Sequence, residues 1–255
     1  MDLNGKIAWV TGSDSGIGKA TAIAFARHGA DVLVHYHQDA DGARDTAAQV
    51  RAAGRRAEVL QADFSDPQGA GAFFVQALET MGGVHVLVND AGVGSGRSHS
   101  LDTTLDEFRH ILNVDLLAPW LLCQAVARHM AAHGGGAIVN ITSVHEEISQ
   151  PGSVAYDAAK AALRSVTRTL ALELASKGVR LNNVAPGLIA TPLTAKKIND
   201  PERAAHDRKQ IPMHRPGEPH EVANVVLFLA SDAASYVTGS SYLVDGGLLR
   251  NIGGA

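Results

Sequence analysis

Short apolar runs alternate with amphipathic helical patterns along this chain, and that alternation constrains its fold more than any other feature. Strand-like runs are predicted at residues 7–11, 31–36, 57–63, 84–90, 136–142, 179–186 and 241–245. Helical patterns lie between them, such as residues 220–231, where apolar residues recur at i, i+3, i+4 and i+7. Strands that alternate with helices favour a parallel sheet covered on both faces. We therefore expect one doubly wound α/β domain over residues 1–255, with about seven strands and ligands at their carboxyl ends.

The first strand runs into a glycine-rich turn, TGSDSGIG at residues 11–18, and then into a helical pattern. Such a turn sets backbone N–H groups and the positive end of a helix dipole against a phosphate. Gly12 permits the tight turn, Gly16 lets the phosphates approach, and Gly18 lets the helix pack close to the strand. The spacing G-x-x-x-G-x-G differs from that of a Walker loop, which argues against a kinase or NTPase.

Tyr156 and Lys160 lie four residues apart in a predicted helix, which places both side chains on one face. An ammonium beside a phenol favours the phenolate and lowers a tyrosine pKa that is otherwise about 10. The pair could therefore exchange a proton near neutral pH without a metal.

Together these motifs resemble the short-chain dehydrogenase/reductase family over essentially the whole chain, which implies a Rossmann-type fold and an NAD(P)-dependent oxidoreductase. The resemblance assigns four catalytic residues. Tyr156 exchanges a proton with the substrate oxygen, and Ser143 orients that oxygen. Lys160 lowers the tyrosine pKa and holds the nicotinamide ribose, and Asn113 holds a water of the proton relay.

The resemblance also implies a cofactor site along the carboxyl edge of the sheet. Residues 87–92, LVNDAG, match a segment usually written NNAG in this family, with Asp90 in place of the second asparagine. Asp63 matches the residue that faces the adenine. The cofactor-binding residues expected from these matches are Gly12, Ser15, Gly16, Ile17, Gly18, Tyr36, His37, Asp63, Phe64, Asn89, Ala91, Gly92, Tyr156, Lys160, Pro186, Gly187, Ile189 and Thr191.

The substrate side resembles the glucose 1-dehydrogenase branch of the family. His145 follows Ser143 by two residues, and we expect it to contact the substrate together with Ser143, Gly94 and Leu188. Gly94 and Ala190 depart from that branch, whose members tend to carry an acidic residue and an asparagine there. Residues 188–213 are the expected substrate lid. The spacing of the 12 histidines fits no metal site, and we interpret most of them as solvated loop residues.

The composition limits the kinds of binding partner and the cellular compartment that we expect for this protein. The net charge of −4 gives no electrostatic reason to expect nucleic acid or an anionic membrane. We expect no bilayer-spanning run, no signal peptide and, with Cys123 as the single cysteine, a cytoplasmic protein.

The end of the second strand determines the choice of nicotinamide cofactor. NAD-specific members of the family place an aspartate there to repel a 2′-phosphate, whereas this chain has Tyr36 followed by His37. We therefore expect NADP(H) to be modestly favoured, with NAD(H) still used.

Three functions remain open from the sequence. The first is an oxidoreductase acting on a sugar or another hydroxylated small molecule. The second is a reductase of a 3-oxoacyl thioester or a less polar ketone, and the third is a regulator that binds the cofactor without chemistry. The helices that carry Asn113 and Tyr156 have more apolar surface than one sheet face needs. The resemblance implies that these helices pair across one two-fold axis and the C-terminal strand across another, so we expect a homotetramer with closed two-fold symmetry.

Overall fold

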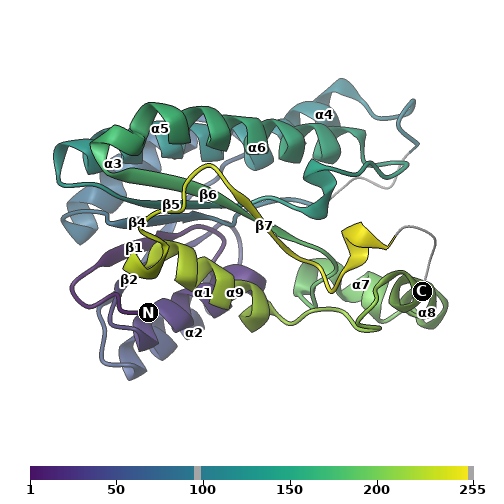
Figure 1. Ribbon diagram of the computed structural model, residues 1–255, viewed down its shortest axis with the longest axis horizontal. Helices are drawn as coiled ribbons and strands as arrows, with labels where there is room; N and C mark the ends of the chain where they lie inside the picture. The colour runs from purple at the N-terminus through teal and green to yellow at the C-terminus, as the bar shows by residue number, and fades with distance from the viewer. Residues whose placement is uncertain (95–98, 252–255) are drawn as a thin grey trace.

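A computed structural model of the protein describes residues 1–94 and 99–251. Within these residues, seven strands form one parallel sheet in the order β3-β2-β1-β4-β5-β6-β7 (Figure 1). The strands are β1 (Ile7–Val10), β2 (Asp31–Tyr36), β3 (Ala57–Gln61), β4 (Val86–Asn89), β5 (Gly136–Ile141), β6 (Val179–Pro186) and β7 (Ser241–Val244). The predicted α/β class and the seven-stranded parallel sheet are confirmed.

The order of the strands reverses beside β1. The chain moves outward from β1 to β3 and then returns to place β4 against the other side of β1. Trp9 on β1 is accordingly paired with Leu33 on β2 and with Leu87 on β4. The connections leave in opposite directions at this point, so a crevice forms at the carboxyl ends of β1 and β4.

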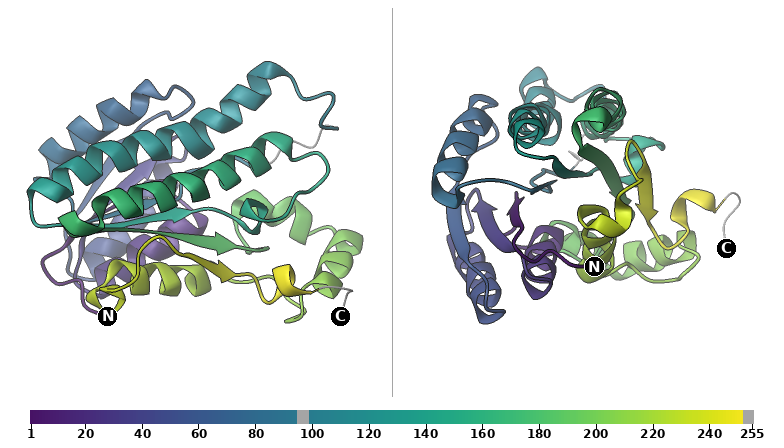
Figure 2. Two further views of the ribbon diagram at one scale, coloured as in Figure 1. Left: turned by 45° about the horizontal axis from the view of Figure 1, so that its top comes forward. Right: turned by 60° about the vertical axis from the view of Figure 1, so that its left-hand side comes forward.

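Helices cover both faces of the sheet (Figures 1 and 2). One layer consists of α1 (Gly16–Arg27), α2 (Ala40–Ala52) and α9 (Pro219–Ala230). The opposite layer consists of α3 (Gln68–Met81), α4 (Leu105–Leu112), α5 (Ala118–Ala132) and α6 (Val154–Leu174). Short 3-10 turns lie at Val144–Glu146, Ala175–Lys177, Pro192–Thr194, Asp232–Ala234 and Leu248–Arg250.

The central strand β1 explains why the strands of this sheet are continuous apolar runs in the sequence. Ala8 and Val10 belong to the core beneath α1 and α9, whereas Trp9 points to the other face. There the ring of Trp9 meets Phe73 edge-on, with ring centroids 6.2 Å apart. Both faces of the strand are buried, so hydrophobic burial favours an apolar residue at every position.

Asn113 lies within one long helical segment. A π-helical turn at Asn113–Leu117 joins α4 to α5, so that helical structure runs without interruption over the 28 residues Leu105–Ala132. The expectation that no run is long enough to span a bilayer is therefore wrong by length and composition alone. Half of its most apolar stretch is nevertheless buried inside the protein, as in a helix that packs on a sheet.

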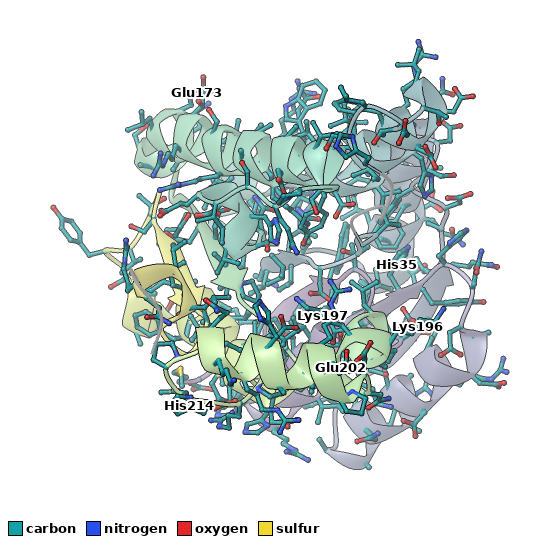
Figure 3. All side chains as sticks on the ribbon, turned by 90° about the vertical axis from the view of Figure 1, so that its right-hand side faces the viewer. His35, Glu173, Lys196, Lys197, Glu202 and His214 are labelled. Atoms are coloured by element: carbon teal, nitrogen blue, oxygen red, sulfur yellow. The ribbon has the colours of Figure 1, made fainter. Side chains whose placement is uncertain are left out.

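The predicted lid lies beyond the ends of β6 and β7, where two short helices, α7 (Ala195–Ile198) and α8 (Pro201–Gln210), extend from the sheet (Figure 1). Figure 3 looks onto this end of the molecule and labels Lys196, Lys197 and Glu202 on the segment. Ala204 and Ile211 are buried beneath it. The segment is thus packed onto the protein on one side. Lys196 and Glu202 are exposed, whereas Lys197 and Asp207 form a partly buried ion pair at 3.3 Å.

Candidate functional site

The glycine-rich turn after β1 has the shape of a phosphate cradle. Gly12 and Gly16 have φ angles of +63° and +55°, which L side chains rarely adopt. A Cβ on Gly12 would lie 2.8 Å from the Ala91 Cα, and one on Gly18 would lie 2.4 Å from the Gly12 carbonyl oxygen. Each of the three glycines is therefore required where the sequence predicted it.

The N-terminus of α1 faces this cradle. Ser15 is the N-cap residue, and among the described residues its side chain makes no capping hydrogen bond. The first turn that follows contains Gly16, Ile17, Gly18 and Lys19, so the N–H groups of the turn and the helix dipole meet no side-chain carboxylate of their own helix. These groups fit a dinucleotide diphosphate.

His35 on β2 supports the cradle from beneath. Its Nδ1 accepts a hydrogen bond from the Gly12 N–H at 3.0 Å, and its Nε2 lies 3.2 Å from the Ala62 carbonyl oxygen. The ring stacks on Phe64 with centroids 4.5 Å apart. Burial lowers the pKa of His35 to about 4, so the ring is neutral and Nε2 donates to Ala62. The interpretation of most histidines as solvated loop residues was wrong for His35, which only the packing of β1 against β2 identifies.

The end of β4 is tied to the same turn. The Thr11 hydroxyl accepts hydrogen bonds from the backbone N–H groups of Asp90 and Ala91, both at 3.0 Å. The Asn89 side chain turns away and donates to Asn140 on β5 at 2.7 Å. Asn89 is buried in this position, where it joins two strands and holds the edge of the cradle.

The segment after β6 closes the cradle from the opposite side. Thr191 lies against the glycine turn, because a Cβ on Gly16 would be 3.3 Å from its Cγ2. Gly187 lies against Asp245, whose Cα would be 2.9 Å from an added Cβ. Ile189 is buried, and Pro186 ends β6. The structure therefore brings the predicted cofactor residues of β1, β4 and β6 to one edge.

The predicted adenosine end lies at the ends of β2 and β3. His37 Nε2 is 3.6 Å from Asp63 Oδ2, and both side chains are about half exposed. Tyr36 packs against the core beside α2. Asp39 caps α2 by accepting from the Gly42 N–H at 2.9 Å, and it raises the pKa of nearby Asp14 in addition to the larger effect of burial. Two carboxylates that the sequence analysis did not consider therefore lie close to this end.

Tyr156, Ser143 and Lys160 lie together at the end of β5. The Ser143 hydroxyl lies close enough to Tyr156 to favour the phenolate, and Lys160 Nζ is 5.4 Å from the centre of the tyrosine ring. Nζ also lies 3.2 Å from the Ile141 carbonyl oxygen and 2.9 Å from Asp115 Oδ1. The structure brings these three predicted residues together.

The expected low pKa of Tyr156 is not observed. Burial raises the pKa of this phenol, and the Lys160 ammonium only opposes the effect. The Lys160 ammonium does not fully cancel the effect of burial on the Tyr156 pKa, because the Asp115 carboxylate offsets the charge of Lys160. For Lys160, burial alone would lower the pKa, but Asp115 and Tyr156 together raise it. The lysine therefore stays charged.

Asn113 begins the π-helical turn and reaches across to the segment after β3. Its Nδ2 donates to the Ser65 carbonyl oxygen at 2.7 Å. Two residues later Asp115 is fully buried, and its Oδ2 accepts from the Val93 N–H at 3.1 Å. Asp115 was missed in the sequence analysis. An acidic residue within the apolar run NVDLL was the available signal for it.

His145 has an acidic partner beside Tyr156. Its Nδ1 is 2.6 Å from Asp157 Oδ1, and both side chains are largely buried. The other Asp157 oxygen accepts from the Gln150 N–H at 3.0 Å. The edge of the imidazole meets the Tyr156 ring with centroids 5.4 Å apart. An Asp–His pair therefore adjoins the predicted site of proton transfer.

A cavity of about 280 Å³ lies next to Tyr156. Its walls come from the segment after β4, from α4 and from the start of α6, and they are mainly apolar. Gly94 lines it, and an added Cβ there would contact Leu193 of the predicted lid at 3.4 Å. Leu188 lies directly after Gly187, and its carbonyl oxygen accepts from the Gly217 N–H at 2.9 Å. Three of the four predicted substrate residues, Ser143, His145 and Gly94, therefore lie beside Tyr156 or line this cavity, whereas Leu188 follows β6 and is not part of the cavity wall.

The family described as enoyl-(acyl carrier protein) reductase matches residues 12–249. The chain belongs to the short-chain dehydrogenase/reductase family. It is an NAD(P)-dependent enzyme of that family, which excludes the non-catalytic regulator.

Three relatives illustrate the range of this family. Glucose 1-dehydrogenase 2 of Bacillus subtilis (strain 168) is 38% identical over 97% of this chain and 96% of the relative. The crystal structure of acetoin dehydrogenase from Enterobacter cloacae is 44% identical, covers 97% of each chain and has a TM-score of 0.89. The gluconate 5-dehydrogenase of Burkholderia cenocepacia J2315, solved with NADP and tartrate, is 31% identical, covers 98% of each chain and has a TM-score of 0.92.

Proposed function

We propose that this enzyme moves a hydride between NAD(P) and a carbon that bears a hydroxyl or carbonyl group, in a small substrate with a second oxygen on the neighbouring carbon. Sugars and other hydroxylated molecules belong to this class. The observation that carries the proposal is the His145–Asp157 pair, with 2.6 Å between Nδ1 and Oδ1, beside Tyr156. With its Nδ1 proton held by Asp157, the imidazole offers Nε2 as an acceptor for a second substrate hydroxyl.

The three relatives named above agree with this class of substrate, whereas a further relative, 3beta-hydroxysteroid dehydrogenase 1 of Eggerthella lenta, is 40% identical over 97% of this chain and agrees better with the second candidate below. Glucose, acetoin and gluconate each carry an oxygen beside the carbon that reacts, although their shapes differ. The Asp157–His145 pair could bind glucose, acetoin or gluconate, because it forms a hydrogen bond with one hydroxyl and does not contact the rest of the substrate.

We assign the catalytic roles to four side chains. The Ser143 hydroxyl donates to the reacting oxygen, and Tyr156 gives or takes its proton. Lys160 keeps a positive charge next to the phenol, which favours the phenolate when the proton leaves. Asn113 holds the segment after β3 through Ser65, so that water can carry the proton onward. The bound nicotinamide supplies or accepts the hydride.

We propose that NADP(H) is modestly favoured and that NAD(H) is also used. Tyr36 stands where a repelling carboxylate would exclude a 2′-phosphate, and His37 can donate to that phosphate. The carboxylates of Asp14 and Asp39 lie close by and weaken the attraction of this end of the site for a 2′-phosphate. Asp63 weakens it further, because its carboxylate also interacts with His37. We expect the two cofactors to differ by about 1–2 kcal/mol, roughly one charge-assisted hydrogen bond.

The enzyme is proposed to be a cytoplasmic homotetramer of one-domain subunits. On the outer face of the α4–α6 layer, Leu172 is 85% exposed and Trp120 is 38% exposed. Tyr236, near the edge strand β7, is fully exposed. Exposed apolar side chains on the α4–α6 layer and near β7 support two separate interfaces between subunits, each across its own two-fold axis. The segment 188–213 is proposed to close over the substrate.

The second candidate is a reductase of a less polar ketone or a 3-oxoacyl thioester. The mainly apolar walls of the cavity beside Tyr156 favour it. A longer acyl chain could be buried there without loss of hydrogen bonds.

A substrate panel with matched variants distinguishes the two. Acetoin, glucose, gluconate, 2-butanone and a 3-oxoacyl thioester are compared by kcat/KM with both cofactors, in the wild type and in His145→Gln and Asp157→Asn. We expect the wild type to prefer substrates with two neighbouring oxygens, and both variants to lose that preference while retaining turnover of 2-butanone. A wild type that prefers 2-butanone or the thioester, and is unaffected by His145→Gln, would establish the second candidate instead.

A further inference from the structure

We propose that Asp90 couples binding of the dinucleotide to uptake of one proton. Asp90 stands where the family segment has asparagine, so this chain carries an acid where a neutral amide is usual. The inference goes beyond the proposed function, because it concerns only the cofactor diphosphate and holds for any substrate.

The geometry places the Asp90 carboxyl inside the phosphate cradle. Its backbone N–H is fixed by the Thr11 hydroxyl at 3.0 Å, which aims the side chain toward the first turn of α1. Oδ2 lies against Gly18, at 2.7 Å from the position that a Cβ on Gly18 would occupy. The proximity of the Gly18 N–H favours the ionised form of this carboxyl. The carboxyl therefore occupies the positive end of a helix that the diphosphate also needs.

The charged groups around Asp90 come from three elements. Lys160 of α6 faces it and favours its ionised form, whereas Asp14 of the glycine turn disfavours that form. Asp115 of the π-helical turn holds Lys160 at 2.9 Å and so removes part of the attraction. Burial outweighs these effects and raises the pKa of Asp90 to about 7.

Binding of a diphosphate adds two negative charges close to this carboxyl. Like charges disfavour the ionised form, so the pKa of Asp90 should rise further in the complex. The sign follows from linkage: a group whose pKa rises on binding takes up a proton, and affinity falls as pH rises through the pKa of the free protein. Below pH 7 the Asp90 carboxyl is already neutral in the free protein, so the affinity for the dinucleotide should not change with pH. Above pH 7 this affinity should fall by up to about tenfold per pH unit.

Proton uptake can be counted directly with ADP-ribose as the probe. This molecule carries the diphosphate but has neither a 2′-phosphate nor a nicotinamide, so neither group contributes its own titration or chemistry. Calorimetry at pH 6–8.5, in buffers of different ionisation enthalpy, gives the protons bound per ADP-ribose and the affinity at each pH.

We expect the wild type to bind close to one proton per ADP-ribose at pH 8, and Asp90→Asn to bind none. The affinity of Asp90→Asn should be independent of pH and exceed that of the wild type by about tenfold at pH 8. His37→Gln is the matched control, because this residue lies near the adenosine end, and the variant should retain the proton uptake. A wild type without proton uptake, or uptake that persists in Asp90→Asn, would overturn the proposal.

A second measurement does not depend on the fold of the variant. The Asp90 carboxyl of the wild type can be titrated by carbon-13 NMR, with and without saturating ADP-ribose. A midpoint that moves upward when ADP-ribose is added supports the coupling, and a midpoint that stays in place refutes it.

Discussion

Lys160 Nζ lies 2.9 Å from Asp115 Oδ1, and both side chains are buried beside the tyrosine that is proposed to transfer the proton. The lysine reaches this position from α6 and the aspartate from the π-helical turn that follows α4. The same carboxylate accepts the Val93 N–H at 3.1 Å. One acidic side chain thus holds the cation of the site and fixes the segment that leads into the substrate cavity.

Removal of that carboxylate should destabilise the enzyme. Asp115→Ala leaves the buried ammonium of Lys160 without its counter-ion, and we expect a loss of about 3–5 kcal/mol in the free energy of unfolding. Urea denaturation measures it. The double variant Asp115→Ala/Lys160→Met, which removes both charges, should recover a large part of the loss, and equal stability of the single and double variants would show that the pair is not coupled.

Tyr156→Phe should abolish turnover and leave cofactor binding nearly intact, because only the oxygen that transfers the proton is removed. Lys160→Ala should impair both, since the lysine is assigned to the tyrosine and to the ribose. Steady-state rates together with NADPH affinity from fluorescence titration separate the two effects. A Tyr156→Phe enzyme that kept most of the wild-type rate would disprove the mechanism.

His35 should make the protein sensitive to acid. Its pKa is about 4 in the folded protein and near 6.5 in the unfolded chain, so the unfolded state binds the additional proton. The stability contributed by the neutral ring is complete above pH 6.5 and decreases as pH falls toward 4, by about 3 kcal/mol in all. Urea denaturation at several pH values measures it. His35→Asn, which keeps an acceptor for the Gly12 N–H, should show a shallower fall over this window, and an equal slope in both proteins would contradict the assignment.

Tyr36→Asp should shift cofactor use toward NAD. The new carboxylate repels a 2′-phosphate and can accept from the ribose hydroxyls. The ratio of kcat/KM for NADP and NAD should favour NADP modestly in the wild type and reverse in the variant. Tyr36→Asn is the uncharged control and should change the ratio less. A wild type strictly specific for NAD would be incompatible with this prediction.

Light scattering at micromolar concentration should give the mass of a tetramer. Leu172→Glu places a charge on the exposed face of α6 and should produce a smaller species, because a carboxylate opposes burial in an apolar contact. Lys177→Glu, just beyond the end of α6 in an exposed turn, serves as the control. A wild type with the mass of a monomer would exclude the proposed assembly.

The sequence by itself determined the features that depend on neighbouring residues. Alternating apolar periods predicted the parallel sheet, and three glycines predicted the turn whose φ angles and close contacts require them. The spacing of Tyr156 and Lys160 predicted a shared helix face. These inferences succeeded because backbone sterics and helical periodicity act over a few positions along the chain.

Only the tertiary structure decided how the charges of the site are set. Asp115 is 45 positions from Lys160, and the contact of His35 with Gly12 needs the packing of two strands. The expectation of a lowered pKa for Tyr156 was wrong for the same reason. The sequence shows that Lys160 is nearby, but it does not show the burial or the Asp115 carboxylate, which both raise the tyrosine pKa. A pKa depends on desolvation and on every charge within a few ångströms, and those distances exist only once distant segments have packed together.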